Sequence, residues 1–577
     1  MHEDRELERL AREALACDPA LAALPLGRLG FVEPERASAA LDRLAGEPPF
    51  LAPLPAQVLV ALARTGRPDQ GLSHLERFVE ITGSRLSLYA RLQDYPRLAD
   101  YLIQVLSHSR FLTDILVRNP EYLYWLFEET PHLEGHLDKP TLARQAHHQV
   151  MGEAGPARRL EALRRFQRRE LLRIGAAEIL GLKPVAQIGR ELADLADVVV
   201  ECALETATAE LGGRYGRPRS ERGQLAHFGV ICLGKHGGQE LNYSSDVDLL
   251  FVYDEDGQTR PPKGGVAISN DEYFTRLGRR LIQMLSEASA EGLLYRVDMR
   301  LRPEGEVGPL VRSLSSLRLY YELHGQLWER QMLIKARLAA GSPKVWARFR
   351  DLVAPFVYPA HFQVSPQEEI RRIKERIESQ ILEQPSRDNN IKLRAGGIRD
   401  IEFVVQCLQL LKGRVELKAR SHHTLEAIRQ LARTHALSHQ EAAQLREAYC
   451  FFRRVENLLQ IEEGRSTYAL PEDPDAARGL AMVLGLADAA ALQAVVEGHL
   501  ERVRRIFEGI FHAGPPTPED WGWLLEAEPG NTRAREALAG RGFGDAERAH
   551  HHLAQLVQGG MVTSTGRLHL EELLPEL

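Results

Sequence analysis

The sequence predicts an α+β fold in which a small mixed β-sheet is embedded in predominantly helical domains. Apolar residues recur every three or four positions over most of the 577 residues, as in the segment 102–116, and this spacing is typical of amphipathic helices. Between about residues 225 and 310 the pattern changes to short runs rich in β-branched and aromatic residues. Helical periodicity resumes beyond Ser315 and continues to about Ala513.

A chain of this length exceeds what one hydrophobic core usually fills, so we expect several regions. These are a helical N-terminal region at 1–150, a sheet-containing domain at 151–355, a helical bundle at 356–514 and a C-terminal helical segment at 515–577. The motif PPTP at 515–518 suits a linker. The pattern GFxxxERAxxxLxxL begins at Gly30 and again at Gly542, which indicates that the last segment repeats an element of the first.

Composition limits the class of partner. A net charge of -7 argues against a long nucleic acid as the main partner, because such proteins need a cationic surface. The five cysteines form no CxxC pair, as expected in a reducing cytosol. The N-terminus lacks the apolar core of a signal peptide, and no run approaches the roughly 20 apolar residues of a membrane span. We therefore expect a cytoplasmic protein with no membrane partner.

One helical segment, 160–182, carries a dense basic side. Its arginines are Arg164, Arg165, Arg168, Arg169 and Arg173. A solvated face paired with nearby acids is favoured over a docking or phosphate site, since charged runs on helices are usually surface features.

Four elements are expected in the sheet region. HFGVICLG is typical of a buried strand and ends at Gly234, and DLLFVY, from Asp248, is typical of a second strand. The segment 271–290 has a helical stripe. LLYRVDMRLRP, at 293–303, alternates apolar and charged residues, which predicts a third strand carrying Asp298.

Acidic residues gather at the strand ends. Asp246 and Asp248 are two apart, so on a strand their side chains share one face. Together with Asp298 they offer the hard oxygen ligands that Mg²⁺ prefers, and two such ions would stabilise both the attacking and the leaving oxygen of a displacement at phosphorus. Nearby arginines, at positions 296, 300 and 302, would hold a phosphate tail. A DxD at a strand start is also often a turn cap, but the combined pattern favours phosphoryl or nucleotidyl transfer.

The spacing of Gly234, Lys235, Asp246 and Asp248 resembles the signature of the nucleotidyltransferase superfamily, with Lys235 where that signature usually has a small residue. More closely, four motifs resemble in order the glutamine synthetase adenylyltransferase/adenylyl-removase family. They are GKHGGQELNYSSDVDLLF, YRVDMRLRPEGEVGPLV, YYELHGQLWERQMLIKAR and IKLRAGGIRDIEFVVQCLQL. The resemblance extends from about Leu106 through Gln460.

The resemblance implies an activity and leaves its direction open. The family attaches AMP from ATP to a tyrosine of glutamine synthetase, or removes it with inorganic phosphate, using two catalytic units in tandem. One DxD unit is present here, and ELNYSSD and VDMRLRP look more like the amino-terminal, deadenylylating unit. The chain is then either a single-unit member or the front half of a longer one.

The resemblance also implies roles for individual residues. Metal ligation falls on Asp246, Asp248 and Asp298, and the nucleotide phosphates would be lined by Gly234, Lys235, Ser244 and Ser245, with the arginines Arg296, Arg300 and Arg302 beside them. Gly396 and Gly397 precede a helix whose amino terminus suits an anion, where Lys392 and Arg399 add positive charge. Glu402 would act as general base or substrate positioner, or form a helix salt bridge with Arg399. The motif YYELHGQLWERQMLIKAR, which contains Lys335, would form a second wall of the nucleotide pocket.

These assignments imply Mg²⁺, with two ions expected, and ATP or ADP and phosphate as substrates. Glutamine synthetase would be the protein substrate, and a PII-type signalling protein is a further candidate partner. Two alternatives stay open: nucleotidyl transfer to another acceptor, and a catalytically idle protein that binds a regulator or glutamine synthetase. The presence of all three acids weighs against the idle protein.

Overall fold

The structure is a computed structural model, and it describes residues 2–16, 19–45, 54–127, 133, 135, 137–263, 265–289, 291–360, 366, 370–372, 374, 389–511, 538 and 545–558. The chain divides into two compact units, residues 1–507 and 508–577. Within the second unit the structure describes the helix α26 (Ala546–Gln558). Gly542, where the second copy of the repeated pattern begins, lies outside the described residues.

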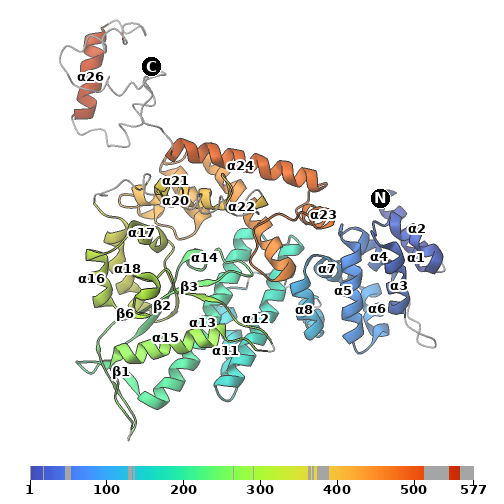
Figure 1. Cartoon of the computed structure of the whole chain (residues 1–577), viewed down its shortest axis with the longest axis horizontal. Helices are drawn as coiled ribbons and strands as arrows, with labels where there is room; N and C mark the ends of the chain where they lie inside the picture. Colours follow the sequence, from blue (N-terminus) through green and yellow to red (C-terminus); the bar gives the residue numbers. More distant parts are fainter. Residues whose placement is uncertain are drawn as a thin grey trace. The chain divides into compact units, whose positions relative to one another are not determined.

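The N-terminal part of the first unit is helical (Figure 1). Its helices are α1 (His2–Ala16), α2 (Pro19–Arg28), α3 (Pro34–Ala45), α4 (Ala56–Ala63), α5 (Pro68–Ile81), α6 (Arg85–Asp94), α7 (Pro96–His108), α8 (Arg110–Arg118) and α9 (Tyr122–Phe127). The helical stripe predicted at 102–116 is divided at Ser109, whose Oγ accepts a hydrogen bond from the Leu112 amide at 2.9 Å and thereby caps α8.

Three longer helices lead into the sheet: α11 (Lys139–Met151), α12 (Pro156–Ile179) and α13 (Val185–Tyr215). The basic side of α12 is not a solvated face. Arg164 and Arg173 are 3% and 2% exposed. Arg168 donates to the carbonyl oxygens of Glu291 and Leu293, and Arg173 pairs with Glu170 and Glu191. The expectation of a solvated face is wrong for most of these arginines, because carboxylates and carbonyl oxygens from folded neighbours satisfy their guanidinium groups. Arg165 is exposed, and the expected pairing with nearby acids is present, as between Arg164 and Glu161.

A five-stranded mixed sheet follows. β2 (Phe228–Cys232) lies between β3 (Val247–Tyr253) and β7 (Arg337–Gly341) and is antiparallel to both. On the other edge of β3, the short strands β5 (Val297–Asp298) and β6 (Val311–Ser313) pair with it in parallel, one after the other. A separate antiparallel pair is formed by β1 (Arg217–Ser220) and β4 (Gly257–Arg260).

The central strands carry apolar residues on both faces of the sheet, so helices cover both faces. One face, with Ile231 and Leu250, packs on α16 (Leu314–Leu323), α17 (Leu327–Leu333) and α18 (Pro343–Val357). On the other face Phe228 stacks on Phe274 of α15 (Asn270–Ser286), with ring centroids 5.4 Å apart. The helix α13 packs against α15 and β7 (Figure 1). Burial on both faces fixes the strands that carry the acidic residues.

A helical lobe completes the first unit. Its main helices are α20 (Ile398–Lys412), α21 (Thr424–Arg433), α22 (His439–Glu463), α23 (Pro474–Val483) and α24 (Ala489–Phe511). Short elements are the helix α14 (Gly234–Gly237) and the 3₁₀ helices η1 (Gly305–Val307) and η3 (Leu417–Ala419). The helix α20 packs on α17, α21 and α22, and α22 also contacts α13 (Figure 1). Of the described helices, none is long and apolar enough to span a lipid bilayer.

The predicted α+β class is confirmed, with differences in detail. The third predicted strand, 293–303, is ordered as a strand only at Val297–Asp298, because the chain turns directly after Asp298. Conversely, β7 falls in a stretch predicted as helical. Its sequence, RLAAG, has no strand pattern, and it is extended because its backbone pairs with β2.

Candidate active site

Two neighbouring strands bring the three aspartates together. In the parallel ladder of β3 and β5, Asp248 is paired with Asp298. Burial, followed by repulsion from the carboxylates of Asp298 and Asp246, raises the pKa of Asp248 to about 7. The three carboxylates therefore act on one another electrostatically, and those of Asp246 and Asp298 also accept hydrogen bonds from arginines. Their donor atoms are the hard oxygens that Mg²⁺ prefers, so the residues present suit a divalent cation.

The turn between β2 and β3 makes room for Asp248. Gly234 begins α14 with φ +55°, a left-handed conformation that glycine adopts without strain. A Cβ at Gly234 would lie 2.3 Å from Oδ2 of Asp248. Gly237 is also tightly packed, since a Cβ there would lie 2.0 Å from the Lys335 carbonyl oxygen. The first glycine therefore admits the carboxylate, and Gly237 admits another backbone segment.

Two arginines lie beside the acids. Arg296 donates from Nε to Asp246 at 2.6 Å and from Nη2 to the Ser244 carbonyl oxygen at 3.0 Å. Arg300 donates to Asp298, whose pKa is lowered mainly by this hydrogen bond. The Arg300 side chain is 70% exposed. Both guanidinium groups are open to solvent and lie at the acid cluster.

Arg302 has a different role from the one predicted. It is 9% exposed, and its guanidinium donates to the carbonyl oxygens of Met299, Glu306 and Gly308. The chain turns after β5, so Arg302 is not on an extended strand with Arg296 and Arg300. Its assignment to phosphate binding is corrected: Arg302 holds the turn that follows Asp298.

The residues around the glycine turn are tied to the helical lobe. Lys235 donates to Asn242 at 2.7 Å and forms an ion pair with Glu456 of α22. Ser244 donates its backbone amide to Gln460 of α22 at 3.0 Å. The hydroxyl of Ser245 donates to Asn242 at 3.2 Å. Lys235 thus lies near the acid cluster with its ammonium group already bound inside the protein.

Glu402 has a buried ammonium group as its partner. Lys335 donates to Glu402 at 3.2 Å and to Glu240 at 2.8 Å. Burial alone would raise the pKa of Glu402, but the positive charges of Lys335, Lys235 and Lys392 together outweigh burial and hold that pKa below its usual value. A carboxylate stabilised in this way is a poor general base, which favours the positioning role for Glu402. The ion pair with Arg399 considered from the sequence is replaced by the one with Lys335.

The start of α20 is not an anion site made of free amides. The amides of Ile398 and Arg399 donate to the carbonyl oxygens of Ile391 and Lys392, at 3.1 and 3.2 Å. Gly396 has φ +82°, and a Cβ there would lie 2.0 Å from the Leu500 carbonyl oxygen. The two glycines thus allow close packing, and the prediction of an anion-binding helix terminus is wrong. The side chains of Lys392 and Arg399 remain beside it.

The helix α22 supplies several polar contacts that were not predicted. Arg453, Glu456, Asn457 and Gln460 recur at helical spacing on one face and are almost fully buried. Asn457 contacts Asn242 and Glu178, and Arg453 donates to Asn242 and Glu240. Polar residues at helical spacing among the apolar positions of this helix were the sequence signal for these residues. Tyr468, which contacts Lys392 and Lys235, was marked by no pattern.

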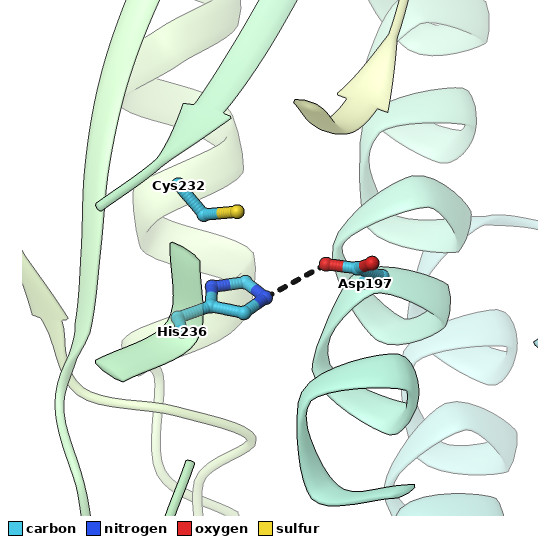
Figure 2. A group of neighbouring side chains, drawn as sticks. All are labelled: Asp197, Cys232 and His236. Carbon is cyan, nitrogen blue, oxygen red and sulfur yellow. Dashed lines mark hydrogen bonds and ion pairs between the residues drawn. The ribbon is translucent and has the colours of Figure 1, made fainter. Parts of the chain in front are cut away.

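A second polar cluster lies deeper in the domain. Figure 2 shows Asp197, Cys232 and His236, whose ligand atoms lie within 4.8 Å of one another. His236 bonds Asp197 at 2.8 Å, and Asp197 also pairs with Arg337 and Lys139. The two cations already neutralise the carboxylate, and burial raises the pKa of the Cys232 thiol to about 12. This cluster therefore links α13 to the sheet, and its carboxylate already has two cationic partners.

Two protein-family models match the chain. Residues 99–352 match the glutamate-ammonia ligase adenylyltransferase family, and residues 368–511 match GlnD PII-uridylyltransferase. Glutamate-ammonia ligase is another name for glutamine synthetase, so the resemblance predicted from the motifs is confirmed over residues 99–352. The helical lobe from residue 368, which the motifs assigned to the same family, matches the second model instead.

Proposed function

We infer that residues 99–352 form a nucleotidyltransferase domain of the glutamate-ammonia ligase adenylyltransferase family, and we propose that the protein moves AMP on and off a tyrosine of glutamine synthetase. The observation that carries the proposal is the pairing of Asp248 with Asp298, beside Asp246, within this region. Such a site handles the phosphorus of a nucleotide.

In this proposal Asp246, Asp248 and Asp298 hold Mg²⁺. The pKa of Asp248, raised by burial and then by repulsion from Asp298 and Asp246, supports it, because a cation would relieve that repulsion. When bound, the metal supplies charge neutralisation at the oxygens of the transferring phosphoryl group. The exposed guanidinium groups of Arg296 and Arg300 bind the phosphate tail. Lys392 and Arg399 contribute positive charge from the lobe.

The chemistry is a displacement at phosphorus. For attachment, the tyrosine oxygen attacks the α-phosphorus of ATP, the P–O bond to pyrophosphate breaks, and the tyrosine proton is released. For removal, an oxygen of inorganic phosphate attacks the phosphorus of AMP-tyrosine, the tyrosine oxygen leaves and takes up a proton, and ADP forms. The motifs ELNYSSD and VDMRLRP favour removal as the main direction.

The region at 368–511 suggests how the activity is controlled. It matches a protein whose name links it to PII, a signalling protein of nitrogen metabolism. In this chain, contacts such as Lys235 with Glu456 tie that region to the glycine turn of the site. A PII-type protein that binds the helical lobe would thus act on the site through directly bonded residues.

One experiment separates the alternatives. The protein is incubated with Mg²⁺, α-labelled ATP and unmodified glutamine synthetase, and in parallel with AMP-modified glutamine synthetase and phosphate. Label on the glutamine synthetase subunit supports attachment, and ADP in the second reaction supports removal. If neither reaction occurs and glutamine synthetase still binds, the idle binding protein is supported. Label transferred only to another acceptor supports the alternative enzyme.

A further inference from the structure

A tyrosine in the lobe contacts both lysines whose charges act on Asp248. Lys392 Nζ is 4.4 Å from the centroid of the Tyr468 ring and donates to the Tyr468 hydroxyl at 3.2 Å. Lys235 Nζ is 5.3 Å from the same centroid. Ammonium groups at these distances from an aromatic ring are attracted to it. One ring thus contacts two cations that come from different parts of the fold.

Backbone contacts hold Tyr468 in this place. The amide of Ile391 donates to the Tyr468 carbonyl oxygen at 3.0 Å, and Ala469 pairs with Asn390 in a β-bridge. The amide of Leu470 donates to the Asn389 carbonyl oxygen at 3.0 Å. The segment with Tyr468 is therefore fastened to the segment that carries Lys392. The backbone that carries the ring is thus held beside the backbone that carries Lys392.

The charges link this arrangement to the acid cluster. Lys235 and Lys392 are the two cations that partly offset the raised pKa of Asp248. Lys235 is bound to Glu456, whereas the hydroxyl of Tyr468 is the one hydrogen-bond acceptor that the described part of the chain gives to Nζ of Lys392. Lys392 therefore has charge available for an anionic ligand, provided that its long side chain is kept in position.

The hydroxyl group of Tyr468 can itself donate a hydrogen bond. Within the described residues, both hydrogen bonds at its oxygen, from Lys392 and from Ser466 at 3.4 Å, have the phenol as acceptor. Burial alone would raise the pKa of Tyr468, but the two lysines outweigh burial and lower it. This environment is polar and cationic, as expected beside a bound phosphate.

We propose that Tyr468 is a positioning residue that holds Lys392 for the phosphates of the nucleotide. The inference rests on the proposed function, because it takes a phosphate-bearing ligand at the acid cluster as given. It adds a residue from the helical lobe that sets affinity for the anion and does not take part in the displacement. Tyr468 would act through Lys392, so its effect should disappear when Lys392 is absent.

Binding of ATP with Mg²⁺, measured by titration calorimetry, tests the proposal without turnover. Loss of one cation–aromatic contact corresponds to about a tenfold weaker affinity, so Tyr468→Leu should raise the ATP Kd about tenfold. Tyr468→Phe keeps the ring and should raise it only about threefold. In the removal reaction, Tyr468→Leu should raise the KM for phosphate by a similar factor, while kcat stays within about twofold of the wild type. Tyr124→Leu, which removes a ring under Arg91 at 4.5 Å, is the matched control.

A double-mutant cycle shows whether Tyr468 acts through Lys392. In a Lys392→Met background, Tyr468→Leu should weaken ATP binding by less than about twofold. Equal ATP affinity of Tyr468→Leu and the wild type, or fully additive effects of the two substitutions, would overturn the inference while the proposed function stands. If wild-type protein binds neither ATP nor ADP in the presence of Mg²⁺, the proposed function itself fails.

Discussion

The carboxylate of Asp248 occupies the space where a side chain at Gly234 would begin, since Oδ2 lies 2.3 Å from the position of a Cβ on that glycine. The glycine that begins α14, just after β2, and the acid on β3 are thus one structural unit. Gly234 also has φ +55°, so both its backbone conformation and its neighbour exclude a side chain.

Gly234→Ala should therefore displace Asp248 and lower activity about 100-fold, the scale expected from a shift of about 1 Å in a reacting group. Steady-state rates with glutamine synthetase measure it. Gly155 is a matched control, because it has φ +86° and no atom within 4 Å of the position of a Cβ. Gly155→Ala also imposes strain from a positive φ, but without the collision, and should retain activity. Equal losses in both variants would contradict this explanation.

Asp248→Asn should lower activity on the order of 1000-fold, because about 4 kcal/mol of charge stabilisation is lost with the ligand. Without divalent cations, the variant should be at least as stable as the wild type, since one of three repelling carboxylates is removed. Thermal unfolding with and without Mg²⁺ checks this. The wild type should gain stability from Mg²⁺ and the variant should not. Normal turnover of Asp248→Asn would show that the metal assignment is wrong.

Lys335→Met should destabilise the protein by about 3–5 kcal/mol, because it leaves the buried carboxylates of Glu240 and Glu402 without their shared cation. The free energy of unfolding in urea measures this loss. Arg350→Met removes an exposed pair with Asp351, in which the side chains are 62% and 71% exposed, and should have little effect. A stability loss no larger than that of Arg350→Met would mean that the buried network does not stabilise the fold.

The stability of the fold should depend on pH through Glu240. Burial alone would raise the pKa of Glu240, but Lys335 and His423 outweigh it and lower this pKa to about 2. The carboxylate then stabilises the folded state above its unfolded pKa, and that contribution is lost as pH falls from about 4.5 to about 2. From the size of the shift, the loss is about 3 kcal/mol.

The measurement compares wild type and Glu240→Gln by urea unfolding at several pH values. The difference in unfolding free energy between them should shrink as the pH is lowered through this window. Asp351→Asn, on the surface, is the control and should follow the wild type at every pH. A difference that does not change with pH would show that Glu240 is not held as a low-pKa carboxylate.

Arg302→Met should lower stability by about 2 kcal/mol, because the carbonyl oxygens of Met299, Glu306 and Gly308 lose their donors. Affinity for ATP should stay within about twofold of the wild type. Arg296→Met, which removes an exposed guanidinium at the acid cluster, should instead weaken ATP binding with little effect on stability. A larger affinity loss in Arg302→Met than in Arg296→Met would restore Arg302 to the phosphate site.

Much of the candidate site could be predicted from short stretches of sequence. Asp246 and Asp248 follow a glycine turn and open an apolar strand, and strand geometry alone places their side chains on one face. Asp298 also lies in a short strand, and its pairing with Asp248 needs only that the two strands be neighbours. The α+β class followed from periodicity in the same way.

The partners of the charged residues were decided by the tertiary structure. Lys235 meets Glu456, 221 residues away, and Glu402 meets Lys335 rather than its helical neighbour Arg399. Arg302 is buried by a turn that strand alternation did not reveal. A long cationic side chain can reach many acceptors, and folding selects among them by burial. Local spacing in this chain determined where the carboxylates gather, whereas distant helices and turns determined which cations remain available to a ligand.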